Sequence, residues 1–383
     1  MYVSRLTAQN WRNFTKIDVS FQETTYLVGA NASGKSNFLD IFRFMRDVAA
    51  PKGGGLQKAI DNRGGLKKIR CLAARQHPNI ELQFELKQNL SSPSPDWIYK
   101  LAFQRDRAQQ VKIVSESVRK NGKEILSRPN QEDQNDPERL TQTFLEQINA
   151  NKDFREIVEF FNDVLYLHLV PQLLKVGNLI AAQRIESDPF GQGFLDEVAA
   201  APKKIRDSRL TRINRILQNA IPQFKELTFE RDNITGSPHL KMLYTHWRVK
   251  GAWQTEDQFS DGTLRLISLL WTLMSSKNLV LLEEPELSLH TPIVEQIPKL
   301  IRVTRSIRKT VYGQIFVSTH SEQLLSDKSL DGKSFLIVRP GKKGESSLIE
   351  SLDENDLQSI RAGIPPADIV FGHTKPAVGR LTL

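Results

Sequence analysis

The spacing of apolar residues predicts strands at the beginning of the chain. Alternating apolar and polar positions predict strands near residues 2–8 and 17–21, and a short apolar run predicts another at 25–28. Residues 35–48 follow a glycine-containing turn and carry apolar side chains at the spacing of a helix. Alternation returns over 80–114 and predicts an antiparallel meander. The chain is therefore expected to open with strands, a turn and a helix, followed by further strands.

The middle of the chain has helical periodicity, and strands return towards its end. Residues 138–217 are predicted to be mostly helical with a break near 188–191, and residues 224–249 are predicted to be strands. The last third predicts two helices, at 264–274 and 293–308, and three buried strands, at 279–282, 315–318 and 335–338. Because buried strands lie at both ends of the chain, we expect an α/β fold whose sheet is completed from both ends.

The composition excludes several classes of protein. The 383 residues are 39% hydrophobic and 25% charged, which is typical of a globular chain long enough to bury a core. The only cysteine is Cys71, which excludes a disulfide framework and a cysteine-based zinc site. The start has no apolar stretch of signal-peptide length, and the longest apolar run, 264–274, is interrupted by Arg265 and Ser268. We expect a cytoplasmic protein with no membrane partner.

The positive charge is concentrated in one segment. The chain has 53 Lys and Arg against 44 Asp and Glu, a formal net charge of +9. Residues 51–130 hold sixteen basic and seven acidic residues, which is the same excess of nine. Basic residues also form helical stripes over 203–215 and 299–309. Such faces are often only solvated, but they also suit sequence-independent contact with DNA phosphates. The predicted DNA contacts are Lys67, Lys68, Arg70, Arg302 and Arg305.

Residues 29–36 form a candidate phosphate-binding turn. Their sequence, Gly-Ala-Asn-Ala-Ser-Gly-Lys-Ser, fits the pattern G-x-x-x-x-G-K-[ST] between a predicted strand and a predicted helix. Glycines let the backbone wrap phosphates, so that N–H groups and a helix N-terminus face the anion. Lys35 would reach the β- and γ-phosphates of ATP, and Ser36 would be a ligand of Mg²⁺. The nucleotide contacts expected in this segment are Gly29, Asn31, Ser33, Gly34, Lys35, Ser36 and Asn37.

Two later predicted strands end in residues suited to catalysis. The strand at 279–282 is followed by Glu283, placed for the metal shell, and by Glu284, placed to orient and deprotonate an attacking water. The strand at 315–318 is followed by His320, which could hydrogen-bond the γ-phosphate or that water. Each segment alone also fits a strand that meets solvent or a structural histidine. The upstream phosphate turn favours the catalytic interpretation.

Residues 259–263, Phe-Ser-Asp-Gly-Thr, come immediately before the apolar helix. Ser260 and Asp261 are good N-cap residues, which is one sufficient explanation for them. The same helix start also offers N–H groups and a hydroxyl to a phosphate. Because the chain already has one phosphate turn, Ser260 and Gly262 are expected to contact a nucleotide on a second subunit.

These four segments occur in the order and spacing of an ABC-type ATPase head. With the runs Asn-Trp-Arg-Asn-Phe at 10–14, Glu-Pro-Glu-Leu-Ser-Leu-His at 284–290 and Ser-Thr-His-Ser at 318–321, the chain resembles the RecF, SMC and OLD branch of that superfamily. It is similar to stand-alone prokaryotic AAA-type ATPases, which often belong to antiviral defence operons; the Septu ATPase subunit is one relative in style. The motifs cover the sheet-forming ends, and the insertion near 90–225 shows resemblance at family level only.

The resemblance implies a P-loop NTPase fold, an ABC-type head with a mixed β-sheet, an antiparallel β-subdomain and a helical insertion. The expected parts are a head of 1–90 and 226–345, an insertion of 91–225 and a polar C-terminal tail of 346–383. The resemblance also implies a head-to-head homodimer, or a higher oligomer, that sandwiches two ATP molecules, with Arg12 and Asn13 near the nucleotide. Two features depart from the family pattern. The metal-shell acid is usually Asp, and the glutamine loop is not clearly identifiable, with Gln76 as one candidate.

The leading functional hypothesis is an ATPase whose ATP-driven head closure regulates a partner effector, a nuclease or toxin encoded by a neighbouring gene. The chain has neither the Asp-x-Asp of a Toprim nuclease nor an HNH-like histidine cluster, so a nuclease centre is not expected in it. One alternative is a RecF-like repair ATPase that binds double-stranded DNA. Another is a scaffold that binds ATP without hydrolysing it.

Overall fold

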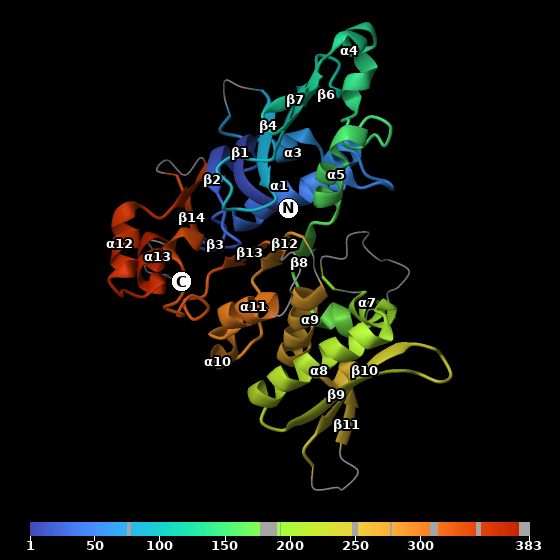
Figure 1. The fold of residues 1–383 in the computed structure, drawn as a ribbon, viewed down its shortest axis with the longest axis vertical. Coiled ribbons are helices and arrows are strands. Elements are labelled where there is room, and N and C mark those ends of the chain that lie inside the picture. Colours follow the sequence, from blue (N-terminus) through green and yellow to red (C-terminus); the bar gives the residue numbers. More distant parts are fainter. Residues whose placement is uncertain are drawn as a thin grey trace, which may run out of the picture. The chain divides into compact units, whose positions relative to one another are not determined.

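The computed structural model divides into two compact units, which are described separately. The structure describes residues 1–74, 78–176, 190–191, 193–246, 252–275, 278–306, 313–341 and 346–374. Unit 1 comprises Met1–Leu165, Lys277–Leu281 and Tyr312–Leu383, and unit 2 comprises Tyr166–Ser276 and Leu282–Val311. Figure 1 shows the elements of both units in sequence colours.

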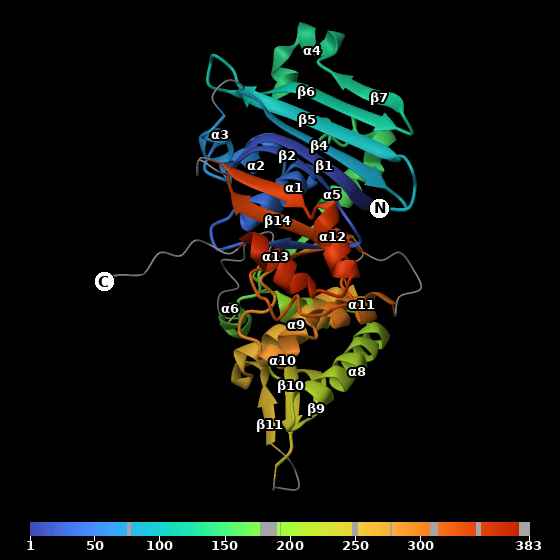
Figure 2. The ribbon, with the colours of Figure 1, turned by 90° about the vertical axis from the view of Figure 1, so that its left-hand side faces the viewer.

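Unit 1 contains an antiparallel sheet with the strand order β2-β1-β4-β5-β6-β7. Figure 2 shows these strands side by side. They are β1 (Tyr2–Trp11), β2 (Phe14–Ser20), β4 (Ile80–Lys87), β5 (Trp97–Arg105), β6 (Val111–Lys120) and β7 (Lys123–Arg128). Alternate positions of β4 are buried, which confirms the alternation seen in the sequence.

The second sheet is mixed, with the strand order β15-β14-β3-β13-β12-β8. Its strands are β3 (Thr24–Val28), β8 (Leu165–Leu167), β12 (Val280–Glu283), β13 (Ile315–Thr319), β14 (Phe335–Pro340) and β15 (Ser347–Ser351). β3 pairs in parallel with β13 and β14, and β14 pairs antiparallel with β15. β8 and β12 begin in unit 1 and continue into unit 2. The expected α/β fold with a mixed sheet built from both chain ends is confirmed.

Helix α1 (Lys35–Ala49) lies between the two sheets of unit 1, as its burial on most sides requires. The ring centroid of Phe42 lies 5.8 Å from that of Phe84 on β4 and 5.2 Å from that of Phe316 on β13. The ring of Phe44 stacks on Phe103 of β5, with centroids 5.5 Å apart. Burying a large aromatic side chain contributes about 1.5–3 kcal/mol. The aromatic residues of α1 therefore fix it between the layers.

Shorter helices complete unit 1. They are α2 (Leu56–Asp61), α3 (Leu66–Ile69), α4 (Gln131–Asn135), α5 (Arg155–Asn162), α12 (Glu354–Arg361) and α13 (Pro366–Thr374), with 3-10 turns at Pro137–Thr141, Lys152–Phe154 and Gly332–Ser334. The expected polar tail therefore contributes a strand and two helices to unit 1. Likewise β5, β6 and β7, placed in the expected insertion, share a sheet with β1.

Unit 2 is built around the apolar helix α9. Its helices are α6 (Pro171–Val176), α7 (Phe194–Ala200), α8 (Lys203–Ala220), α9 (Asp261–Ser275), α10 (Thr291–Val294) and α11 (Ile297–Ser306), with a 3-10 turn at Glu256–Gln258. Its antiparallel sheet has the order β11-β10-β9, from β9 (Phe224–Arg231), β10 (Pro238–Tyr244) and β11 (Ala252–Thr255). α9 packs against α6, α8 and α11, which explains why it is apolar on most sides.

The expectation of mostly helical structure over 138–217 missed the strand β8. Three residues are too few to show the alternation by which strands are recognised, and helical segments flank them on both sides. The expected break near 188–191 lies largely outside the described residues. Within the described parts of the chain, no helix is long and apolar enough to cross a membrane.

A buried ion cluster joins β6, β7 and α4. The Arg128 side chain is fully buried, and its guanidinium lies 2.9 Å from the Glu116 carboxylate and 2.8 Å from that of Asp133. Tyr99 Oη also donates to Glu116, at 3.0 Å. Burial alone would raise the pKa of Asp133, but the bond and charge of Arg128 and the backbone N–H of Asn130 together outweigh it and lower that pKa to about 2. Part of the positive charge of 51–130 is thus internal rather than on a surface.

Glu146 links this region to helix α2. Its Oε2 accepts a hydrogen bond from the backbone N–H of Leu56 at 2.8 Å, and its Oε1 accepts one from Thr143 N–H at 2.7 Å. Burial raises the pKa of Glu146 to about 7, although both backbone bonds favour the carboxylate. A carboxyl whose pKa is raised by folding stabilises the fold most below its unfolded pKa. That contribution is lost as the pH rises through about 7.

Replacing Glu146 by Gln should flatten the pH dependence of stability. Between about pH 4.5 and pH 7 the wild type should lose about 1–3 kcal/mol that the variant does not lose, after allowance for partial exposure of the side chain. The Gln side chain has one acceptor oxygen, so it loses one of the two backbone hydrogen bonds at every pH. The informative quantity is therefore the slope of stability against pH, not the stability at one pH. Unfolding midpoints across this range test the prediction. Glu159→Gln, at an exposed position of α5, is the control, and parallel curves for wild type and Glu146→Gln would contradict it.

Candidate functional site

The turn at 29–36 follows β3 and begins helix α1. Gly34 has φ 113°, a left-handed conformation that favours glycine, and Ala32 has φ 62°. A Cβ at Gly34 would lie 2.2 Å from Asn13 Nδ2, and one at Gly29 would lie 2.3 Å from the Val338 carbonyl oxygen. Gly29 is therefore required by its close approach to a backbone oxygen, and Gly34 by its left-handed conformation. Of the other predicted contacts, Asn31 and Ser36 are exposed at its mouth.

The interior of the turn suits a phosphate. The Lys35 ammonium is buried and donates to the carbonyl oxygens of Gly29 at 2.8 Å and Ala30 at 3.1 Å. Ser33 Oγ is buried with no hydrogen-bond partner among the described residues. An unpaired buried hydroxyl is costly and calls for a polar partner. A cation, a hydroxyl and a helix N-terminus converge here, which is the chemistry that holds a nucleotide phosphate.

Asn13 links the phosphate turn to β15 and to helix α1 through side-chain hydrogen bonds. Its Nδ2 donates to the Ser33 carbonyl at 3.3 Å and to Ser347 Oγ at 2.7 Å, and its Oδ1 accepts from Asn37 Nδ2 at 2.9 Å. Ser347 Oγ donates in turn to the Ser33 carbonyl at 2.6 Å. The predicted residues Asn13, Ser33 and Asn37 are therefore brought together. Ser347, at the start of β15, was missed, because no local motif marks a partner more than 300 positions away.

Arg12 pairs with Asp40 of α1. Its guanidinium bonds Asp40 Oδ2 at 2.6 and 2.9 Å, and Arg63 bonds both Asp40 oxygens, at 2.9 Å for the closest. Burial alone would raise the pKa of Asp40, but Arg63 and Arg12 outweigh it and lower the pKa from its ordinary value. Arg63 also pairs with Asp47, so this member of the basic segment is a structural cation.

His320 lies next to the phosphate turn in the mixed sheet. β13 pairs with β3 in parallel, with Thr319 opposite Val28. The exposed His320 therefore leaves β13 at the level where Gly29 leaves β3. Residues at the same end of neighbouring parallel strands share one edge of the sheet, where ligands of α/β folds bind.

In unit 2, Glu283 is the last residue of β12 and Glu284 follows it. Tyr166 Oη on β8 donates to Glu283 Oε2, a contact that no motif predicted. Glu284 has φ 44°, which is uncommon for a residue with a side chain and typical of functional positions. The buried Arg265 of α9 donates to the Glu284 carbonyl oxygen at 3.2 Å. The backbone at the predicted catalytic carboxylate is thus held by a helix.

The turn at 259–263 starts α9. Ser260 Oγ accepts from Thr263 N–H at 3.2 Å and lies 2.8 Å from Thr263 Oγ1, so the N-cap interpretation holds. Asp261 pairs with Lys175 at 2.8 Å. A Cβ at Gly262 would lie 2.5 Å from the Ser288 carbonyl oxygen, so this position requires glycine. Ser260 itself is exposed at the helix start.

The predicted DNA contacts are divided between the units. Lys67 and Lys68 are exposed on α3, and Arg70 is half-buried with Nη2 donating to the Ala74 carbonyl at 2.8 Å. Arg302 is exposed on α11. The side chain of Arg305 and the glutamine-loop candidate Gln76 lie outside the described residues.

Comparisons with known proteins agree with this fold. A family model described as "AAA domain, putative AbiEii toxin, Type IV TA system" matches residues 25–326. Endonuclease GajA of Bacillus cereus (strain VD045) is 22% identical over 350 residues, which cover 85% of this chain and 56% of GajA. The DNA replication and repair protein RecF of Synechocystis sp. is 29% identical over 90 residues, 23% of each chain. The chain thus spans just over half of one relative and under a quarter of the other.

A solved SMC head bound to the C-winged helix domain of ScpA has a TM-score of 0.54 at 13% identity, covering 94% of this chain and 100% of that one. At this identity the likeness shows the fold alone. With the matching AAA-domain family model and the similarity to GajA and RecF, this fold confirms the expected class, an ABC-type ATPase head of the RecF, SMC and OLD branch.

Replacing Asn13 by Asp should weaken ATP binding. The Asp carboxylate cannot donate the two hydrogen bonds that Asn13 Nδ2 makes. It also places a negative charge next to the Ser33 carbonyl, in the turn proposed to bind the negatively charged phosphates of ATP. We expect a loss of affinity of about 10- to 100-fold, the usual effect of a lost buried hydrogen bond to a neighbour that stays unpaired. A fluorescent ATP analogue measures the affinity. Asn89→Asp, where the side chain only accepts, is the control, and equal affinity of the two variants would contradict the prediction.

Proposed function

The chain belongs to the AAA-domain family whose model it matches over residues 25–326, and from this we propose that it binds and hydrolyses ATP to control a partner effector. ATP-dependent head dimerisation is the proposed control step. The observation that carries the proposal is the phosphate turn, where Gly34 in a left-handed conformation, the buried Lys35 ammonium and the Ser33 hydroxyl converge.

We assign the roles as follows. Lys35 binds the β- and γ-phosphates, and His320 contacts the γ-phosphate or the attacking water. Glu284 orients that water and accepts its proton, in the manner of a general base. Mg²⁺, held by Ser36 and Glu283, would neutralise charge on the phosphates. Ser260 and Gly262 are proposed to contact the nucleotide of the second head of a homodimer, because they lie at an exposed helix start.

The proposed effector is a nuclease or toxin from a neighbouring gene. Two observations support it: the similarity to an endonuclease, GajA, covers 56% of that protein, and this chain has no Asp-x-Asp motif. The match to RecF favours a second candidate, a repair ATPase that binds double-stranded DNA. Stimulation of turnover by duplex DNA without any effector would favour this second candidate. Binding of ATP without turnover would favour a scaffold.

Two substitutions test ATP hydrolysis. Lys35→Ala should abolish binding of an ATP analogue, because it removes the only cation shown inside the described phosphate turn. Glu284→Gln should keep binding, reduce turnover about 100-fold or more and accumulate a dimer with ATP, because general-base loss affects the chemical step. Phosphate release and light scattering measure these effects. Glu295→Gln, at an exposed position of unit 2, is the control; unchanged hydrolysis in both test variants would sink the proposal.

Replacing Tyr166 by Phe should raise the Mg²⁺ concentration needed for half-maximal turnover. The hydroxyl orients Glu283, and loss of such an outer partner usually weakens metal affinity by about 10-fold or more. A Mg²⁺ titration of turnover measures the shift, and Tyr244→Phe on β10 is the matched control. If both variants need the same Mg²⁺ as the wild type, Glu283 is not positioned by Tyr166 for the metal.

A further inference from the structure

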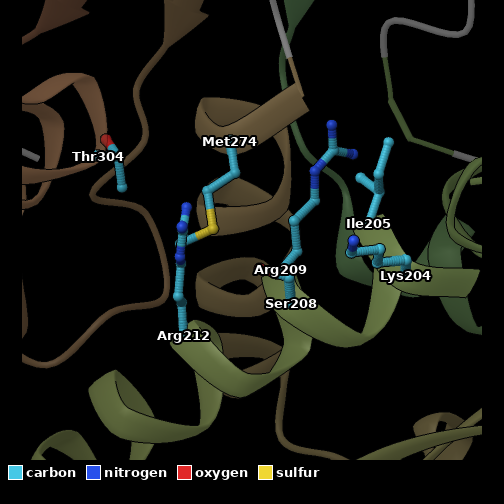
Figure 3. Close-up of a pocket in the computed structure, with 7 residues that line it drawn as sticks. All are labelled: Lys204, Ile205, Ser208, Arg209, Arg212, Met274 and Thr304. Atoms are coloured by element: carbon cyan, nitrogen blue, oxygen red, sulfur yellow. The ribbon is translucent and has the colours of Figure 1, made fainter. Parts of the chain in front are cut away.

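Unit 2 contains a cationic pocket that none of the predicted sites includes. It has a volume of about 350 Å³ and lies between α8, α9 and α11. Its lining residues are Lys204, Ile205, Ser208, Arg209, Arg212, Met274 and Thr304. Figure 3 shows Arg209 and Arg212 rising from α8 with Met274 of α9 beside them. Three of the seven lining side chains are cations and none is an anion, so the lining favours a negatively charged ligand.

Arg209 is held against a buried aromatic ring. The Arg209 guanidinium lies 4.9 Å from the ring centroid of Trp271, a fully buried residue of α9. Among the described residues, neither Lys204 nor Arg212 forms an ion pair, so the charge of both remains available to a ligand. The charge of Arg206, which does not line the pocket, is already engaged, because its guanidinium lies over the Phe229 ring and near Asp207.

The remaining lining matches a phosphate ester better than a bare ion. Ser208 brings a hydroxyl that can donate to a phosphate oxygen, and Ile205 and Met274 offer apolar surface. The Thr304 hydroxyl already donates to the Leu300 carbonyl at 2.7 Å, so it can only accept. An ester of phosphate presents both an anionic group and a sugar that packs on apolar side chains. Guanidinium groups bind phosphate oxygens through paired hydrogen bonds, which gives arginine an advantage over lysine in such a site.

Cations continue beyond the pocket in both directions along α8. Lys203 is exposed before it and Arg215 after it. From Lys204 to Arg215 the helix rises about 16 Å, at 1.5 Å per residue. Over that length one strand of DNA carries about five phosphates. A small nucleotide would not require cations outside the pocket, whereas a polymer that runs along the helix would.

We propose that this pocket and the cationic face of α8 bind the phosphate backbone of a nucleic acid without reading its sequence. Lys204, Arg209 and Arg212 contact successive phosphates, and the apolar lining packs against sugar. The phosphate turn of unit 1 contributes nothing to this site. The proposal therefore stands whether or not the chain hydrolyses ATP.

The test replaces Lys204 and Arg212 by Glu in the full chain and measures binding of a labelled duplex of about 30 base pairs by anisotropy. We expect affinity to fall about 10-fold or more, and the slope of log affinity against log salt to lose about 2, because two phosphate contacts are removed. The control Lys225→Glu with Arg231→Glu makes the same charge change on β9 and should have a smaller effect. ATP-analogue binding should be unchanged.

Other outcomes overturn the proposal. Equal losses of duplex affinity in the test and control variants would show that binding depends only on the net charge of the protein and not on this pocket. Loss of adenosine monophosphate binding with duplex and single-strand binding intact would identify a small-nucleotide site instead. If the Glu variant does not fold, as judged by its unfolding midpoint, the Lys204→Gln, Arg212→Gln pair replaces it. If this double Gln variant bound the duplex as tightly as the wild type, the proposal would also be contradicted.

Discussion

The burial of helix α1 between two sheets is the constraint on which unit 1 depends. An amphipathic helix needs one covering layer, but α1 carries aromatic residues towards both sheets, so it is stable only with a layer on each side. The antiparallel sheet supplies one layer and the mixed sheet the other. Because α1 cannot shift without exposing these side chains, its N-terminus is held at a fixed place. The phosphate turn lies at that N-terminus, so packing of the core positions the chemistry.

Asp40 is the polar exception on this buried helix. A carboxylate in such a place is costly unless cations surround it, and here Arg12 and Arg63 do so from the β1–β2 turn and from the segment after α2. The same turn carries Asn13, whose amide holds the Ser33 carbonyl. One hairpin turn therefore satisfies a buried charge and braces the phosphate turn. The resemblance to ABC-type heads pointed to both residues; in the structure Arg12 pairs with Asp40 and Asn13 bonds to the Ser33 carbonyl.

Elements with strong local signals could be predicted from the sequence, and those defined by distant partners could not. α1, β3 and the phosphate turn were predictable, because apolar spacing and glycine placement are local. β8 could not be predicted, because three residues are too few to show a repeating pattern of apolar positions. The contact between Tyr166 on β8 and Glu283 could therefore not be predicted either. Arg63 is one of the sixteen basic residues of segment 51–130. Only the fold shows that it faces Asp40, since charge counts along a chain do not distinguish an inner cation from an outer one.

Helix α9 ties together the features of unit 2. The turn with Ser260 precedes its start, Arg265 in its first turns holds the Glu284 carbonyl, and Met274 near its end lines the cationic pocket. A straight helix of fifteen residues is about 22 Å long. Most residues of α9 are buried, and close packing of this kind resists bending, so a displacement of one end would be passed to the other end. A phosphate bound beside Met274 and a nucleotide bound beside Ser260 would act on the same rigid element. That shared helix would link the proposed nucleic-acid binding to Glu284 within unit 2.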